Sequence, residues 1–119
     1  MGLSAFQTDS QAFVSPGDYL RLAREAEFKH EYFQGNIRAM ASTSFARNRI
    51  CANLTGELYV QLRGKRCSAV GSDQRIQILS GNAYVYPDLT VGCGPPEFRD
   101  DQKPDTLLNP TLLVKVCAS

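Results

Sequence analysis

Two stretches in the first half of the chain carry apolar residues at the period of a helix. In the first, apolar positions spaced by three, four and seven residues lie on one face of a helix predicted over 16–26, and Ser15 supplies a capping hydroxyl before it. In the second, a small or aliphatic residue recurs at every fourth position from Ala46 to Leu62, and Gly64 then provides a left-handed helix end. The pattern therefore predicts two helices.

Most of the other apolar residues alternate with polar ones or form short runs, which are the two patterns typical of strands. Residues 30–34 and 37–41 flank the turn pair Gly35-Asn36 and predict a hairpin. Later strands are predicted at 67–70, 75–79, 83–91 and 112–117, with a glycine- and proline-rich loop at 92–104. This order of elements indicates an α+β fold in which helices pack against a sheet.

The last predicted strand is apolar on both faces over 112–114, which favours a central position in the sheet. Because a central strand needs a neighbour on each side, we expect C-terminal elements of the domain to be missing beyond Ser119. Residues 1–14 show no sustained period and are predicted to be a lead-in. Since domains commonly run to about 100 to 150 residues, the sequence predicts a single, partial domain at 15–119.

Composition and charge narrow the classes of function. Apolar residues make up 43% of the chain and charged residues 21%, which argues against a disordered or low-complexity protein. Thirteen Lys and Arg against twelve Asp and Glu give a net charge of +1, so any contact with nucleic acid must come from a local cluster. The apolar runs are too short to cross a bilayer and the start lacks the features of a signal peptide, so we expect a cytoplasmic protein without a membrane partner.

The cysteines are predicted to be free thiols. A chain without a signal peptide is expected in a reducing compartment, where disulfides are uncommon. None of the cysteines forms a CxxC pair, so a zinc ribbon is not expected either. The four cysteines are Cys51, Cys67, Cys93 and Cys117.

Two acidic residues are candidates for chemistry. In Tyr86-Pro87-Asp88 a proline interrupts a strand pattern, and because proline removes a ladder donor it marks a bend where the next carboxylate can face a cleft. The second acid, Glu31, lies in the predicted hairpin. Taken alone, either carboxylate is more commonly a solvated acid or a turn residue. His30, the only histidine, is assigned a structural role beside Glu31, because no nucleophile partner is evident.

Six segments along the chain resemble, in order, those of the Uma-type "putative restriction endonuclease" family. They are SPGDYL (15–20), KHEYFQGNI (29–37) with AMA (39–41), NRICANL (48–54), GSD (71–73), YPDLTV (86–91) and LLNP (107–110). The resemblance implies a fold similar to the PD-(D/E)XK nuclease superfamily, a restriction-endonuclease-like mixed sheet packed with two N-terminal helices. It also implies a hydrolase that cleaves DNA with a divalent cation, usually Mg²⁺.

The resemblance gives the two acids roles. Asp88 would be the central ligand of Mg²⁺, and Glu31 would be the early acid that completes or supports the site. Hard oxygen ligands suit Mg²⁺, which uses one or two protein carboxylates and keeps several waters. In phosphodiester cleavage the cation would activate a water and neutralise charge on the scissile phosphate.

The chain departs from the family pattern at Lys115, where the family strand carries an acid. An ammonium cannot ligate Mg²⁺, and three interpretations remain open. Lys115 is an exposed lysine on a strand edge, or it pairs with Asp88 and makes the site chemically silent. In the third, the site is divergent and takes its second acid from elsewhere, for instance from Asp73.

These observations predict a degenerate, metal-dependent DNA endonuclease that is inactive in this chain. Basic residues on and after the second helix would contact the DNA backbone, although a solvated helix face is the commoner explanation. These residues are Arg47, Arg49, Arg63, Lys65 and Arg66. The alternative is a noncatalytic interaction module on the same scaffold, in which the last strand pairs with a second copy to give a homo-oligomer.

Overall fold

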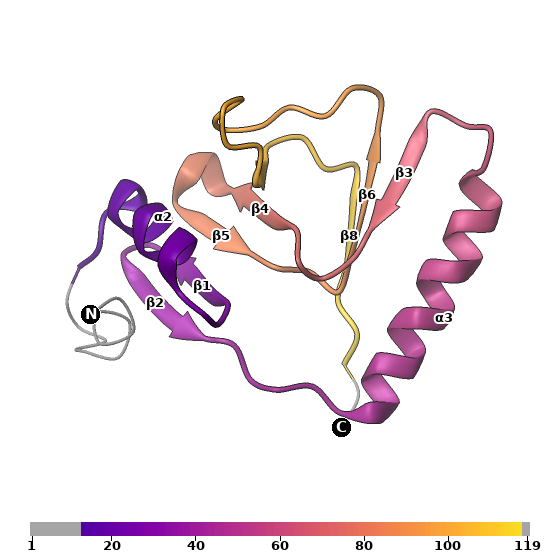
Figure 1. The fold of residues 1–119 in the computed structure, drawn as a ribbon, viewed down its shortest axis with the longest axis horizontal. Coiled ribbons are helices and arrows are strands. Elements are labelled where there is room, and N and C mark those ends of the chain that lie inside the picture. Colours follow the sequence, from indigo (N-terminus) through magenta and orange to yellow (C-terminus); the bar gives the residue numbers. More distant parts are fainter. Residues whose placement is uncertain (1–12, 118–119) are drawn as a thin grey trace. The chain divides into compact units, whose positions relative to one another are not determined.

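The structure is a computed structural model that describes residues 13–117, and it comprises two compact units. The first unit contains residues 13–41 and 77–85, and the second contains residues 42–76 and 86–117. Figure 1 traces the chain through both. Most of the predicted lead-in, residues 1–12, lies outside the described residues. Within 13–117, neither helix is both long and apolar enough to cross a membrane.

The first unit begins with α2 (Pro16–Glu25), which confirms the helix predicted there. Ser15 caps it, because its Oγ accepts a hydrogen bond of 3.2 Å from the backbone N–H of Asp18. The chain then forms the predicted hairpin from β1 (His30–Phe33) and β2 (Asn36–Ala39), which pair antiparallel.

The hairpin turn lies one residue earlier than the sequence suggested. Phe33 and Asn36 face each other in the ladder, so the two turn residues are Gln34 and Gly35 rather than Gly35 and Asn36. Both have positive φ, 45° and 94°. A two-residue turn with positive φ at both positions matches the right-handed twist of the strands, and glycine adopts that conformation without strain.

The sheet of the first unit has the order β2-β1-β5-β4, with β5 (Ala83–Val85) antiparallel to β1. A short 3₁₀ turn, η1 (Leu79–Gly81), joins β4 (Arg75–Ile78) to β5. The core of this unit consists of aromatic rings from α2, β1 and β5 with one leucine. Its buried members are Tyr19, Leu20, Tyr32 and Tyr84, and the ring centroids of the three tyrosines lie 5.1–5.8 Å apart.

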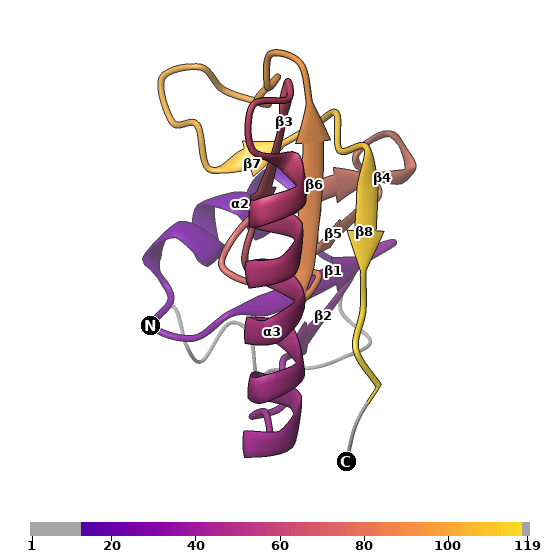
Figure 2. The same ribbon diagram turned by 90° about the vertical axis from the view of Figure 1, so that its right-hand side faces the viewer.

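The second unit contains the long helix α3 (Phe45–Leu62), which packs against β3 (Cys67–Val70), as Figures 1 and 2 show. Gly64 follows the helix with φ of 78°, so the predicted left-handed helix end is confirmed. An antiparallel sheet of order β3-β6-β8 is completed by β6 (Leu89–Cys93) and β8 (Leu112–Val114).

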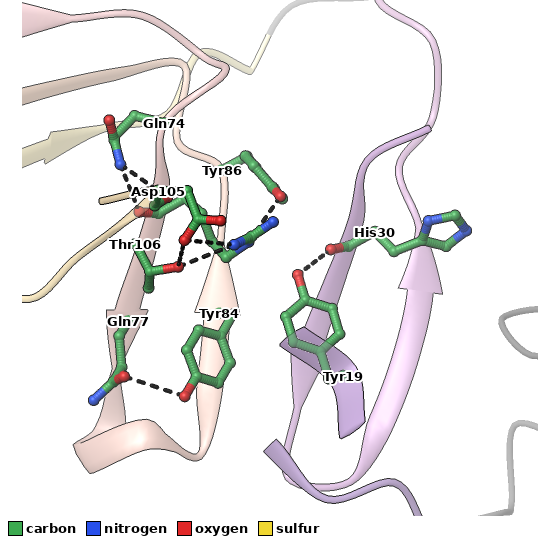
Figure 3. Close-up of polar contacts among 9 residues, drawn as sticks. Tyr19, His30, Gln74, Gln77, Tyr84, Tyr86, Asp105 and Thr106 are labelled. Atoms are coloured by element: carbon green, nitrogen blue, oxygen red, sulfur yellow. Dashed lines mark hydrogen bonds and ion pairs between the residues drawn. The ribbon is translucent and has the colours of Figure 1, made fainter. Parts of the chain in front are cut away.

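A parallel pair makes the chain's strand pairing mixed, as predicted. Arg75 and Ile76, the first residues of β4, pair in the second unit with β7 (Thr106–Leu107). The buried Arg75 guanidinium donates to the Tyr86 hydroxyl at 2.9 Å and to Thr106 Oγ1 at 3.0 Å (Figure 3). Asp105 completes this group with an ion pair of 3.3 Å. Buried arginine requires such partners, because an unpaired buried charge is strongly unfavourable.

Two strand predictions were wrong in detail. The strand predicted at 83–91 is two strands, β5 and β6, because Tyr86-Pro87-Asp88 interrupts the pairing. The strand predicted at 112–117 ends at Val114. Among residues 13–117 it pairs on one side with β6, so its central position in the sheet stays a prediction. Leu112 and Leu113 are 51% and 38% exposed in the described part of the chain.

The prediction of free thiols was also wrong for one pair of cysteines. Cys67 on β3 and Cys93 on β6 face each other in the antiparallel ladder, with Cα atoms 3.9 Å apart, and form a disulfide. Cys51 and Cys117 are free, as predicted. This pair could not be detected from the sequence, because the two cysteines are 26 positions apart and only the strand register brings them together.

Candidate functional site

Asp88 lies in the second unit, where the chain leaves the 86–88 break and enters β6. Pro87 precedes it and is buried, so the backbone has turned before the acid is reached. The Asp88 side chain is 11% exposed. A carboxylate with this little solvent needs partners, because removing its charge from water is unfavourable.

Those partners come from both ends of the second unit's sequence. The Arg47 Nη2 atom lies 3.0 Å from each carboxylate oxygen of Asp88, and the backbone N–H of Val116 donates to Oδ2 at 2.6 Å. Arg47 is fixed in turn, because its own backbone N–H donates at 3.1 Å to Oγ of Ser44, the cap of α3. One carboxylate therefore ties the first turn of α3 to the segment that follows β8.

The pKa shifts show that this arrangement favours the charged form of Asp88. Burial tends to raise the pKa of the Asp88 carboxyl, but the hydrogen bonds from Val116 and Arg47 and the charges of Arg47 and Lys115 outweigh it. The pKa of Asp88 is therefore lower than its ordinary value. The hydrogen bond to Asp88 raises the pKa of Arg47. Burial, followed by the charge of Asp88, raises the pKa of the Cys51 thiol one turn further along α3.

Lys115 is exposed, and its charge lies close enough to Asp88 to contribute to the lowered pKa of that carboxyl. The ion pair within 4.0 Å that Asp88 forms in the described part of the chain is with Arg47. The cation beside Asp88 is thus an arginine that the sequence analysis assigned to DNA contact, and Lys115 adds a second positive charge at longer range.

The residues present at Asp88 do not fit a magnesium ion. Both carboxylate oxygens already accept hydrogen bonds, and the nearest charges are positive. Across residues 13–117, no group of three His, Cys, Asp or Glu side chains is arranged to hold a metal ion. Binding of Mg²⁺ would require the carboxylate to give up these partners, and the positive charges of Arg47 and Lys115 oppose the approach of a cation.

The other two acids considered for the site are Glu31 and Asp73, which belong to different units. Glu31 is in the first unit, opposite Arg38 in the β1–β2 ladder, and lines a hollow of about 590 Å³ with Phe33 and Ile37. Asp73 is exposed in the turn before β4.

His30 has the structural role that the sequence analysis assigned to it. It is buried, with its ring Nδ1 2.9 Å from the carbonyl oxygen of Phe28. Its own carbonyl accepts a hydrogen bond from the Tyr19 hydroxyl (Figure 3). These contacts hold the start of β1 against α2 in the first unit.

The basic residues of α3 divide between two faces of the helix. Arg47 lies on the inner face, 20% exposed, where Asp88 engages it. The others are exposed on the helix or on the turn that follows it: Arg49, Arg63, Lys65 and Arg66.

Sequence reasoning overlooked Arg47 as the partner of Asp88, although a signal was present. The predicted repeat of four extended back from Leu62 to Ile50 and Ala46 with Cys51 nearby, whereas a period of 3.6 brings Arg47 to the same face as Cys51. The structure agrees with the second placement, since Ile50 is 42% exposed and Arg47 is mostly buried. An arginine on an otherwise apolar helix face predicts a buried acidic partner.

A solved structure shares the fold of this chain. A crystal structure described as "a putative nuclease belonging to DUF820", from Anabaena variabilis, matches 88% of this chain and 59% of its own chain, with a TM-score of 0.69 and 16% identity. The α+β prediction is thereby confirmed at the level of the fold.

Comparison of the sequence with known families identifies the family of the chain. The model of the family described as "Putative restriction endonuclease" (Uma2) matches residues 16–119, and the chain belongs to this family. Two uncharacterised proteins of Synechocystis sp. (strain PCC 6803) are similar to it: slr1290 at 35% identity over 87% of this chain, and sll1609 at 29% over 89%. The chain spans 53% and 59% of these two relatives, little more than half of their length.

Proposed function

We propose that this chain is a DNA-contacting domain on the scaffold of a metal-dependent endonuclease, and that it does not cleave DNA as it stands. One observation carries the second part of the proposal: Arg47 and the Val116 N–H already occupy the Asp88 carboxylate. The family membership and the nuclease-like fold support the first part.

Only an active endonuclease on this scaffold would depend on a metal ion. Such a form would use Asp88 as the Mg²⁺ ligand and Glu31 as accessory acid, whereas this chain carries Lys115 in place of the strand acid and pairs Asp88 with Arg47. A guanidinium satisfies the charge of a carboxylate, but it cannot supply the Lewis acidity or the activated water that a bound cation supplies.

Contact with DNA would rest on charge at the surface of the second unit. Residues 45–66 contain five of the thirteen Lys and Arg residues and one of the twelve acids. Four of those cations are exposed: Arg49, Arg63, Lys65 and Arg66. Exposed cations on one helix and the turn after it can follow DNA phosphates, and binding that depends on them weakens with salt.

A plasmid assay tests the proposed lack of cleavage. Purified wild-type protein incubated with supercoiled plasmid and Mg²⁺ or Mn²⁺ is expected to leave the plasmid intact, because the Asp88 carboxylate is held by Arg47 and is not available to the metal. Asp88→Asn is the matched control, since it removes the carboxylate and should give the same gel. The proposal would be refuted if the wild type nicked or linearised the plasmid and the Asp88→Asn protein did not.

A noncatalytic interaction module is the second candidate, and the exposed edge of β8 favours it. Leu112 and Leu113 are 51% and 38% exposed on a strand that pairs on one side with β6 and has no further neighbour among residues 13–117. An edge strand with apolar side chains is a template for pairing with another chain. Under this candidate, light scattering at micromolar concentration should give a homo-oligomer that Leu112→Lys returns to monomer, whereas a monomeric wild type would eliminate it.

A further inference from the structure

A hollow lies where α3 ends and β3 begins, within the second unit. Its volume is about 310 Å³, near the lower end of the range of about 300–1,000 Å³ found for ligand pockets. The walls include an aromatic ring, two cations and a hydroxyl. The residues that matter for ligand chemistry are Tyr59, Arg63, Lys65 and Ser68.

The aromatic ring is presented to solvent rather than packed into the unit. Tyr59 is 65% exposed, and the guanidinium carbon of Arg63 lies 5.7 Å from its ring centroid. A cation at this distance is held by the ring's negative face. The pair therefore joins a stacking surface to a positive charge at the rim of the hollow.

The frame around the hollow is fixed by hydrogen bonds and a covalent link. Gly64 takes a left-handed conformation, and the backbone N–H of Lys65 donates to the carbonyl oxygen of Leu62 at 2.9 Å. The carbonyl oxygen of Arg66 accepts a hydrogen bond of 2.7 Å from Gly94. The next residue, Cys67, lines the hollow and is bonded to Cys93. A preformed wall favours binding because little freedom is lost when a ligand enters.

Charge selects the chemistry of that ligand. Arg63, Lys65 and the adjacent Arg66 are cations, and Glu57 is the one acid in the stretch 45–66. A ligand with a phosphate is therefore favoured over one with an amine. Exposed aromatic rings beside cations are the arrangement with which proteins bind unpaired nucleotides, whose bases stack on the ring while their phosphates meet the cations.

We propose that this hollow binds one unpaired nucleotide of single-stranded DNA, with its base stacked on Tyr59 and its phosphate beside Arg63 and Lys65. The inference rests on the DNA contact proposed above and adds a subsite to it. A paired base cannot enter in this way, because its faces are covered by its neighbours in the stack. The hollow would thus distinguish frayed or single-stranded DNA from intact duplex.

Fluorescence anisotropy with a labelled oligothymidylate tests the proposal. Tyr59→Ala is expected to weaken binding about tenfold, the size typical of one lost base stack, while Tyr59→Phe keeps the ring and stays within about twofold of the wild type. An abasic strand of the same length should bind the wild type about as weakly as oligothymidylate binds Tyr59→Ala. Circular dichroism of each variant checks that it is folded.

Phe45→Ala is the matched control, because Phe45 is an exposed aromatic residue at the opposite end of the same helix and should not affect binding. The inference is overturned if Tyr59→Ala binds oligothymidylate as well as the wild type, or if the abasic strand binds the wild type equally well. A labelled duplex separates this result from failure of the proposed function. If Tyr59→Ala still binds duplex, the proposed DNA contact stands even when the nucleotide subsite is refuted. If the wild type binds neither duplex nor single-stranded DNA, the proposed DNA contact is refuted as well.

Discussion

Replacing Asp88 with asparagine is expected to lower the free energy of unfolding by about 2 kcal/mol, because it removes the charge that holds Arg47 and Val116. A hydrogen bond to a charged group is worth about 1.5–3 kcal/mol, and a neutral amide in place of the carboxylate would leave the partly buried Arg47 guanidinium without its counter-charge. Urea denaturation followed by circular dichroism measures the change. Arg49→Met on the exposed face of α3 should change stability by less than about 0.5 kcal/mol.

A double-mutant cycle separates the pair from its surroundings. Arg47→Met alone leaves the Asp88 carboxylate with the Val116 hydrogen bond and no adjacent guanidinium. The combined Arg47→Met and Asp88→Asn variant should be less destabilised than the sum of the single changes, with a coupling energy of about 1–2 kcal/mol. Additive effects would show that the two side chains do not stabilise one another.

Removing the two positive charges and restoring an acid is expected to create a metal site. In a variant that combines Arg47→Gln with Lys115→Glu, Asp88 loses its guanidinium partner and gains the strand carboxylate that the family resemblance implies. Two carboxylates without a competing cation suit Mn²⁺ or Mg²⁺, both of which prefer oxygen ligands. Isothermal titration calorimetry should detect Mn²⁺ binding to this variant, and the further change Asp88→Asn should abolish it.

Much of the fold followed from local chemistry. Ser15 and the helical period of the residues after it predict α2, and Gly64 marks the end of α3. Local signals did not determine which strand pairs with which. The pairing of β8 with β6, for example, depends on neighbours that a sequence pattern does not reveal.

The site was predictable in part. The acid after Pro87 was identified from its position at an interrupted strand, and the structure places it at that interruption. Its partner was not identified, because 41 positions separate Arg47 from Asp88 and the repeat of four placed Ala46 and Ile50 on the inner face at the start of α3. The Val116 hydrogen bond lay beyond sequence reasoning altogether, since a backbone N–H carries no signature of the side chain it will meet.

We expect the ion pair with Arg47 to keep a metal ion from binding Asp88. Titration of the wild-type protein with Mn²⁺, with free Mn²⁺ followed by electron paramagnetic resonance, tests this claim most directly because it requires neither DNA nor cleavage. The expected result is a free Mn²⁺ signal that rises with added metal as it does in the Asp88→Asn protein. Saturable binding of one Mn²⁺ per chain that Asp88→Asn removes would contradict the claim.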